Sequence, residues 1–418
     1  MFYLLLIIIL FSIIYIKYTD IDPENFKNYS IINEPGISID KPLYNKYTIG
    51  TGEYDTPYHI FGKALINLNV TNIGAILTSG STINIEKVNS GEFDYAICQE
   101  DILYDKVLQL NKHKKKMDNV RFVTSLYEEL YFLMVKKTSS ISAFTTIGNG
   151  FTDIGRNYII GTGDKDSGSL ESLRQLCKIF NINLIRFIVN GTNTENANGN
   201  LYYIDESINY NFNLFLKEKI DGVFYVSGPK MSYIYNISNI TQVKFITLGG
   251  SNFKILKQLM SNKNNEGNIK ITENITGTEN TDNVQTQGVR SILICNKKMD
   301  NTHVYDLLKS IYSNLEYIKQ FMANQNQNQN LYFINNQDTS YYDEFKPLEM
   351  FYINKNITIH PGAYNFYKEI GYINREGNKE CNYNLDDSTC NLVPSLDKKD
   401  VYWKYKNILA SEIMGGQT

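Results

Sequence analysis

The 418-residue chain has few of the residues that usually carry catalysis or metal binding. It contains 4 histidines, 5 cysteines and 1 tryptophan. The histidines form no HExxH pair, no serine stands in a GxSxG motif, and no cysteines have the spacing of a zinc site. The sequence indicates neither a metal nor a cofactor, and it favours a protein that is not an enzyme.

An excess of positive charge is also missing. Lys and Arg number 41 against 44 Asp and Glu, which gives a formal net charge of −3. Because no broad positive field is present to hold a phosphate backbone, we exclude nucleic acid as a partner. The chain is 42% hydrophobic and 20% charged, so it can bury cores, and its length is typical of two or three domains.

Residues 1–16 form a nearly uninterrupted hydrophobic run. As a helix they would span about 24 Å, slightly less than the ~30 Å hydrocarbon core of a membrane. No small-x-small cleavage motif follows, which favours an uncleaved signal-anchor over a cleaved signal peptide or a buried core segment. We expect this membrane segment at 1–18, a polar tether at 19–46, and a body outside the cytoplasm, in a periplasmic, extracellular or lumenal space.

The cysteines fall into two groups. Cys98, Cys177 and Cys295 lie within hydrophobic runs and are expected to be buried thiols. Cys381 and Cys390 lie in the polar segment CNYNLDDSTC, where an oxidising compartment would favour a disulfide between them.

Strand patterns alternate with helical patterns along most of the chain. In a first set, strands are expected at YTIG (47–50), AILTSG (75–80) and YAIC (95–98), followed by two strands around a turn at Tyr127 and Glu128. A second set runs from YIIG (158–161) to GVFYV (222–226), and VRSILIC (289–295) is a further strand. This βαβ rhythm predicts parallel sheets flanked by helices. Polar Asn-rich segments are interpreted as surface loops, at 191–200, 261–283 and 324–330.

Three turns rich in Gly, Ser and Thr follow expected strands and precede expected helices. They are Gly50-Thr51-Gly52, Ser79-Gly80-Ser81 and Ser167-Gly168-Ser169. Such turns expose backbone amides at helix N-termini, at the sheet edge where α/β proteins bind ligands, and these donors favour an anion. Ordinary N-capping by Ser81 or Ser169 would explain a single turn. Three turns of one kind, with Gln99 ending a further strand, favour a shared anion site.

Six segments, in order along residues 47–372, resemble the TAXI (TRAP-associated extracytoplasmic immunogenic) solute receptors. They are IGTG with FGKAL (49–65), TSGSTINIEKVNSGEFDYAICQED (78–101), SLYEELYFLMV (125–135), IGTGDKDSGSLESL (160–173), KIDGVFYVSGPK (219–230) and HPGAYNFYKEIG (360–371). The resemblance implies a two-lobed α/β fold of the type II periplasmic-binding-protein kind, with parallel or mixed sheets, flanking helices and a hinge. It implies lobe 1 at 47–142 and 289–372, lobe 2 at 143–288, and a C-terminal tail at 373–418.

The same resemblance implies a function. Such a receptor captures a small organic anion, either a glutamate-like amino acid or a dicarboxylate, in a cleft that closes about the hinge, and it serves membrane permease subunits. The family pattern places ten residues at the cleft: Thr51, Tyr54, Ser79, Gly80, Ser81, Gln99, Tyr127, Ser167, Gly168 and Ser169. We interpret His360 as structural, since HPGA begins an expected helix and Gly362 would permit a tight turn.

The sequence departs from the family pattern at charged positions. Asp164 and Asp166 precede Ser167, where they would repel an anion, and Glu128 stands after Tyr127 in place of the usual proline. Lys230 is the candidate for charge compensation. These departures keep an alternative open, a surface or interaction protein that derives from such a receptor and has lost small-ligand binding.

Overall fold

Three parallel strands open the first half of the sheet. β1 (Tyr47–Gly50) pairs with β2 (Ile73–Ile76) on one side and with β3 (Tyr95–Gln99) on the other. Helices α2 (Pro57–Asn67) and α3 (Ser81–Ser90) connect these strands, as expected for parallel neighbours that need a crossover. The sequence pattern predicts β1 and β3 close to these positions, whereas β2 begins two residues before the strand expected at 75–80 and ends at Ile76.

The computed structural model describes residues 46–68, 72–112, 117–142, 144, 158–187, 200–228, 243–246, 248, 270–273, 285–325, 357–370, 373–375 and 392–394. The chain divides into two compact units, Met1–Tyr44 and Asn45–Thr418, and every described residue belongs to the second unit.

A second half of the sheet repeats the strand–helix alternation. β5 (Ile159–Thr162) is followed by α6 (Gly168–Ile179), β6 (Asn183–Arg186), β7 (Asn200–Asp205), α7 (Ile208–Leu216) and β8 (Gly222–Ser227). β5 lies parallel between β7 and β8, and β6 pairs with the outer edge of β7. Within the described residues this half therefore has its own group of parallel strands in the same sheet.

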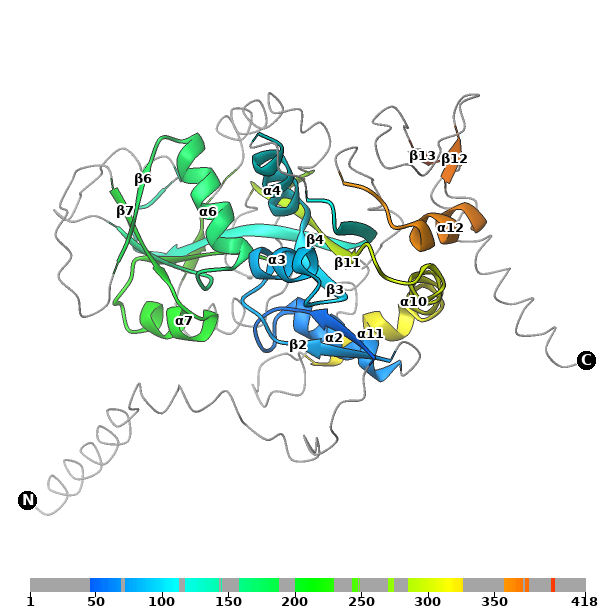
Figure 1. Ribbon diagram of the computed structural model, residues 1–418. Helices are drawn as coiled ribbons and strands as arrows, with labels where there is room; N and C mark the ends of the chain where they lie inside the picture. Colours follow the sequence, from blue (N-terminus) through cyan, green and yellow to red (C-terminus); the bar gives the residue numbers. More distant parts are fainter. Residues whose placement is uncertain are drawn as a thin grey trace, which may run out of the picture. The chain divides into compact units, whose positions relative to one another are not determined.

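Two long strands, β4 and β11, run through both halves (Figure 1). β4 (Val120–Lys136) pairs antiparallel with β11 (Gln285–Asn296) over its first part and with β8 over Leu130–Val135. β11 is also antiparallel to β3, and β9 (Val243–Phe245) pairs antiparallel with the end of β4. In the first half the strand order is β2-β1-β3-β11-β4, and β11 runs antiparallel to the other four strands. In the second half the order is β7-β5-β8-β4-β9, and β4 runs antiparallel to the other four.

This repeated order defines a mixed α/β fold that resembles the type II periplasmic binding proteins. The two crossing strands are joined by hydrogen bonds, so they form a narrow connection between the halves. A connection of two strands can bend while each half keeps its own packing.

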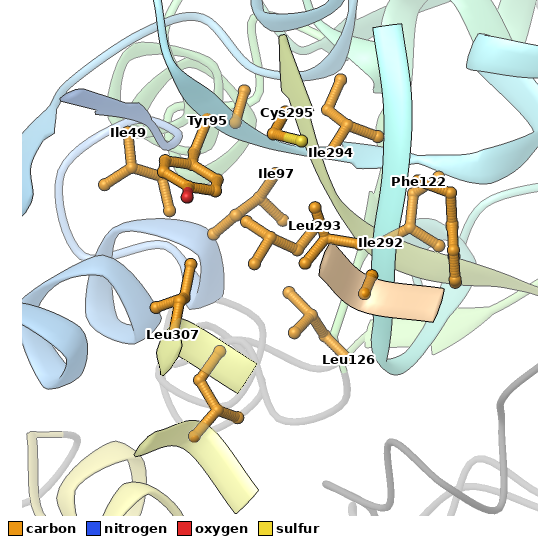
Figure 2. Close-up of a cluster of buried hydrophobic side chains, with 14 of the residues drawn as sticks. Ile49, Tyr95, Ile97, Phe122, Leu126, Ile292, Leu293, Ile294, Cys295 and Leu307 are labelled. Atoms are coloured by element: carbon orange, nitrogen blue, oxygen red, sulfur yellow. The ribbon is translucent and has the colours of Figure 1, made fainter. Parts of the chain in front are cut away.

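Separate hydrophobic cores stabilise the two halves. In the first, Ile49, Ile97 and Leu293 from adjacent strands are fully buried, and Leu307 of α10 (Asn301–Ser313) packs beside them (Figure 2). In the second, Ile160, Leu173 and Phe224 belong to a different cluster around β5, α6 and β8. Each buried Ile, Leu or Phe side chain contributes about 1.5–3 kcal/mol. The buried thiols expected at Cys98, Cys177 and Cys295 are confirmed.

The remaining helices that the structure describes are α4, α11 and α12. α4 (Glu100–Lys112) begins directly after β3, and α11 (Leu315–Gln325) follows α10 and packs against α2. α12 (Pro361–Glu369) packs against α10, and Ile359 just before it forms a parallel bridge with Phe122 of β4. Short strands pair as β10 (Lys270–Glu273) with β11 and as β12 (Ile373–Arg375) with β13 (Leu392–Pro394).

The structure corrects three expectations. The turn at Tyr127 and Glu128 is wrong, because β4 continues through these residues with a bulge: Ser125 faces Ile292 and Glu128 faces Arg290. The interpretation of 261–283 as loop is wrong at β10, which finds a partner in β11. Gly362 makes no tight turn: it lies in the first turn of α12, and a β-carbon there would overlap the backbone of Asn301.

Several predictions lie outside the described residues. They are the membrane segment, the tether up to residue 45, Lys230, the Cys381–Cys390 disulfide, and most of the tail. Among the helices that the structure describes, none combines the length and the hydropathy needed to cross a membrane.

Candidate functional site

A small cavity lies between the two halves, at the carboxyl ends of their parallel strands. Its volume is about 60 Å³. The first half contributes the loop after β1, the starts of α2 and α3, Gln99 of β3 and Glu129 of β4. The second half contributes the starts of α6 and α7 and the end of β8. The lining comprises Gly52, Glu53, Thr56, Pro57, Tyr58, Ser79, Gly80, Ser81, Gln99, Glu129, Gly163, Ser167, Gly168, Ser169, Ile208, Tyr225, Val226 and Ser227.

The N-terminal ends of α3 and α6 meet at this cavity. Gly80 precedes α3 with a φ of 120°, a conformation that glycine adopts readily, and a β-carbon there would lie 3.8 Å from the Gly168 nitrogen. The Ile83 backbone amide of α3 donates to the Asp166 carbonyl of the second half at 3.3 Å. On α6, the Ser167 hydroxyl accepts from the Leu170 amide at 3.1 Å and caps the helix. Two helix starts, with their positive dipole ends, therefore converge.

Side chains also bridge the halves beside the helix starts. The Gln99 amide donates to Ser172 Oγ at 3.0 Å, and the Gln99 oxygen lies so close to Gly168 that a β-carbon there would overlap it. Ser79 Oγ donates to Asp164 Oδ2 at 3.1 Å. These contacts hold the halves against each other, so the structure represents a closed arrangement.

Two carboxyl groups line the cavity. Glu129 Oε2 accepts from the Tyr58 hydroxyl at 2.7 Å, and Glu53 Oε2 accepts from the Ile208 amide at 3.0 Å, at the start of α7. Burial raises the pKa of Glu129 to about 8, although the Tyr58 hydrogen bond lowers it. Burial also raises the pKa of Glu53 to about 7, against the Ile208 hydrogen bond. None of the described residues that line the cavity is Lys, Arg or His.

Seven of the ten residues predicted at the cleft line this cavity: Ser79, Gly80, Ser81, Gln99, Ser167, Gly168 and Ser169. The other three do not. Thr51 is buried and its hydroxyl donates to the Ile76 carbonyl at 2.8 Å. Tyr54 is 46% exposed beside the His59 ring, and the Tyr127 ring lies against Gly228. A ligand role for any of the ten stays a prediction.

Six polar residues of the cavity were not predicted from the sequence: Glu53, Thr56, Tyr58, Glu129, Tyr225 and Ser227. Glu53 carries a signal, because it follows the glycine turn after the first strand. Tyr58 follows in the first turn of α2, the helix that comes after this loop. Glu129 carries no comparable signal, since the bulge in β4 decides which way its side chain points.

The described residues offer no metal centre. Among them, no three His, Cys, Asp or Glu side chains come together as a group able to hold a metal ion. The polar groups that converge are hydroxyls, amides and two carboxyl groups, which suit an organic solute.

Two halves with separate cores, joined by two strands and facing each other across a polar cavity, define a protein built to enclose a small molecule. The chain belongs to the NMT1-like family, whose sequence profile matches residues 49–371. This is a family of solute-binding proteins and is not enzymatic.

Solved structures with similarity to the chain have low identity to it. A protein from Bordetella bronchiseptica is 9% identical, with 77% of this chain and 97% of that chain covered and a TM-score of 0.45. A cysteine-binding protein from Campylobacter jejuni is 9% identical (70% and 93% covered, TM-score 0.39), and a putative L-cystine ABC transporter protein from Listeria monocytogenes is 11% identical (67% and 94%, TM-score 0.37). No protein with a curated description matches the chain.

Proposed function

We propose that the chain is an extracytoplasmic receptor of the TAXI type, which captures a small carboxylate solute between its halves by hinge closure. The observation that carries this proposal is the meeting of α3 and α6, from different halves, at one cavity. Exposed amides at two helix starts are suited to a carboxylate, and closure brings both sets of donors to the same group. The solute is a glutamate-like amino acid or a dicarboxylate.

The energetics permit useful affinity without a cationic side chain. Charge-assisted hydrogen bonds contribute roughly 1.5–3 kcal/mol each. Three or four of them, reduced by ordering costs, reach the micromolar range, near about −8 kcal/mol. The cavity of about 60 Å³ is much smaller than the roughly 300 Å³ of a typical ligand pocket. The halves would therefore have to open before a solute enters.

The proposal includes a location and partners. We propose lobes at 47–142 with 289–372 and at 143–288, held outside the cytoplasm by the N-terminal hydrophobic run. A receptor that releases its solute needs an acceptor in the membrane, so permease subunits are the expected partners.

A thermal-shift panel of amino acids and organic acids tests the proposal. A solute present at 100 times its dissociation constant should add about 2.7 kcal/mol of stability. Positive compounds are then titrated by calorimetry. The absence of any shift across the panel would contradict solute reception.

A second function, a receptor-derived surface protein without a ligand, is favoured by one observation. The Gln99 side chain against Gly168 and the Ser79–Asp164 hydrogen bond occupy space that a ligand would use. Under this alternative, Ser81→Ala does not change the binding of any solute. Under the main proposal the same substitution weakens solute binding by removing a hydroxyl from the cavity wall.

A further inference from the structure

The two halves begin with nearly the same short sequence, YTIGTGE at 47–53 and YIIGTGD at 158–164. The two stretches differ only at the second residue and at the closing acid. Each contains the central parallel strand of its half, β1 or β5, and the glycine loop that follows the strand. The sequence repeat therefore coincides with the repeated strand order of the fold.

Equivalent asparagine side chains hold the two glycine loops. Asn84 of α3 donates to the Thr51 carbonyl at 2.5 Å, and both residues are buried. Asn211 of α7 donates to the Thr162 carbonyl at 2.6 Å, and these residues are also buried. Because Thr51 and Thr162 have the same place in the repeat, α3 of the first half is the counterpart of α7 of the second.

The acids that close the repeat, Glu53 and Asp164, each contact the opposite half. Glu53 Oε2 accepts from the Ile208 amide, at the start of α7, at 3.0 Å. Asp164 Oδ2 accepts from the Ser79 hydroxyl, just before α3, at 3.1 Å. Since α3 and α7 are counterparts, the first half makes the same kind of contact to the second half as the second half makes to the first.

We propose that Glu53 and Asp164 are positioning residues that form a reciprocal latch, in which each acid accepts a hydrogen bond from the helix start of the other half. The inference rests on the hinge closure of the proposed function but requires no particular solute. Both contacts join one half to the other, so both are lost when the halves separate. Two such contacts in opposite directions also fix the orientation in which the halves meet.

Glu53 acts in this latch as a hydrogen-bond acceptor. Burial raises its pKa to about 7, so both protonation states are present at neutral pH. The ionised and the protonated carboxyl group each have an oxygen that can accept the Ile208 hydrogen bond. A side chain that keeps such an oxygen without the charge should therefore keep the latch, and a side chain without the oxygen should lose it.

Pulsed electron resonance on the full chain, measured without any solute, tests the latch. Spectroscopic labels at the exposed residues Asn67 of α2 and Asn213 of α7 report the distance between the halves. The wild type is expected to give a broad distribution that includes the distance of the closed arrangement. Glu53→Ala and Asp164→Ala should each lower the ratio of closed to open molecules about fivefold, the effect of one lost hydrogen bond. The double variant should lower it further.

Three matched variants are expected to leave the distribution unchanged. Glu53→Gln keeps an acceptor for the Ile208 amide. Asp94→Ala and Asp221→Ala remove acids that also have equivalent places in the two halves. Asp94 accepts from the Thr48 amide at 2.9 Å, within the first half. Asp221 accepts from the Ile159 amide at 2.8 Å, within the second half. Thermal unfolding confirms that every variant folds.

The outcomes separate the latch from solute reception. A wild type without a closed component, or alanine variants at Glu53 and Asp164 with the wild-type distribution, would overturn the latch and leave solute reception standing. Glu53→Gln as open as Glu53→Ala, or controls as open as the latch variants, would overturn it as well. If the latch variants open as expected while no compound of the thermal-shift panel binds, the latch stands and solute reception is wrong.

Discussion

Arg290 and Glu100 form a buried ion pair beside the bulge in β4. The Arg290 side chain is 11% exposed and that of Glu100 is 2% exposed. Burial raises the pKa of Glu100, and the Arg290 guanidinium acts in the opposite direction. Since Arg290 belongs to a crossing strand and Glu100 opens α4, the pair ties the connection between the halves to the first half.

We predict that Arg290→Met destabilises the protein by about 3–5 kcal/mol, because it leaves Glu100 buried without its partner. Urea unfolding, followed by circular dichroism, measures the loss. The double variant Arg290→Met with Glu100→Gln should recover most of it. An Arg290→Met variant as stable as the wild type would show that the ion pair does not contribute to stability.

The residues of the site differ in how far sequence alone could place them. Gly80, Ser81 and Gly168 could be predicted, because a turn after a parallel strand always reaches the same sheet edge. Glu129 could not. Side chains alternate along a strand, and the extra residue between Ser125 and Glu128 shifts the later part of β4 to the other face. Only the pairing with β11 reveals that shift.

At the scale of elements, His360 is the N-cap of α12 and is fully buried. Its Nδ1 accepts from the Gly362 amide at 3.1 Å, and Nε2 lies 3.1 Å from the Met299 carbonyl, which fits a neutral ring. Burial lowers the pKa of His360 to about 4, while the Met299 hydrogen bond raises it. The structural role expected from the sequence agrees with this placement.

This pKa predicts how stability depends on pH. In the unfolded chain the pKa of His360 has its ordinary value of 6.5, whereas in the folded chain it is about 4. The neutral His360 ring therefore contributes about 3 kcal/mol to the free energy of unfolding above about pH 6.5, and this contribution is lost as the pH falls to 4. His360→Asn keeps a capping side chain without the titration. The difference in unfolding free energy between wild type and variant should follow this curve; a flat difference would contradict it.

The start of α6 offers a test of closure. A β-carbon at Gly168 would overlap Gln99 Oε1 and crowd Ser81 Oγ, which both belong to the first half. Gly168→Ala should therefore leave the second half folded but oppose the closed arrangement. We expect solute affinity to fall at least tenfold with little change in thermal stability, measured by calorimetry and thermal unfolding. Unchanged affinity would mean that the halves do not approach this closely with solute bound.

Elements with strong local patterns could be predicted, and those that depend on distant partners could not. β1 occupies the residues expected for it, 47–50, and α3 (Ser81–Ser90) lies within one residue of the helix that the pattern at 82–90 predicts. β10 has a polar sequence and becomes a strand by pairing with β11. β4 has a local turn signal at Tyr127, which tertiary pairing on both sides overrides.

At the scale of the whole molecule, the two crossing strands decide what motion is available. β4 and β11 connect two halves that have separate cores, so bending there disturbs few buried contacts. Polar contacts between the halves close the cavity, among them Ile83 with Asp166 and Gln99 with Ser172. A solute that adds further hydrogen bonds across the cavity would shift the population toward the closed arrangement.

The most direct test of solute capture is a distance measured between the halves with and without solute. Asn67 at the end of α2 and Asn213 in α7 are exposed and suit paired spectroscopic labels for pulsed electron resonance. Without solute we predict a broad or longer distance distribution, and with a saturating solute from the thermal-shift panel a shorter and narrower one. A solute that binds with measurable heat while this distribution stays unchanged would contradict capture by closure.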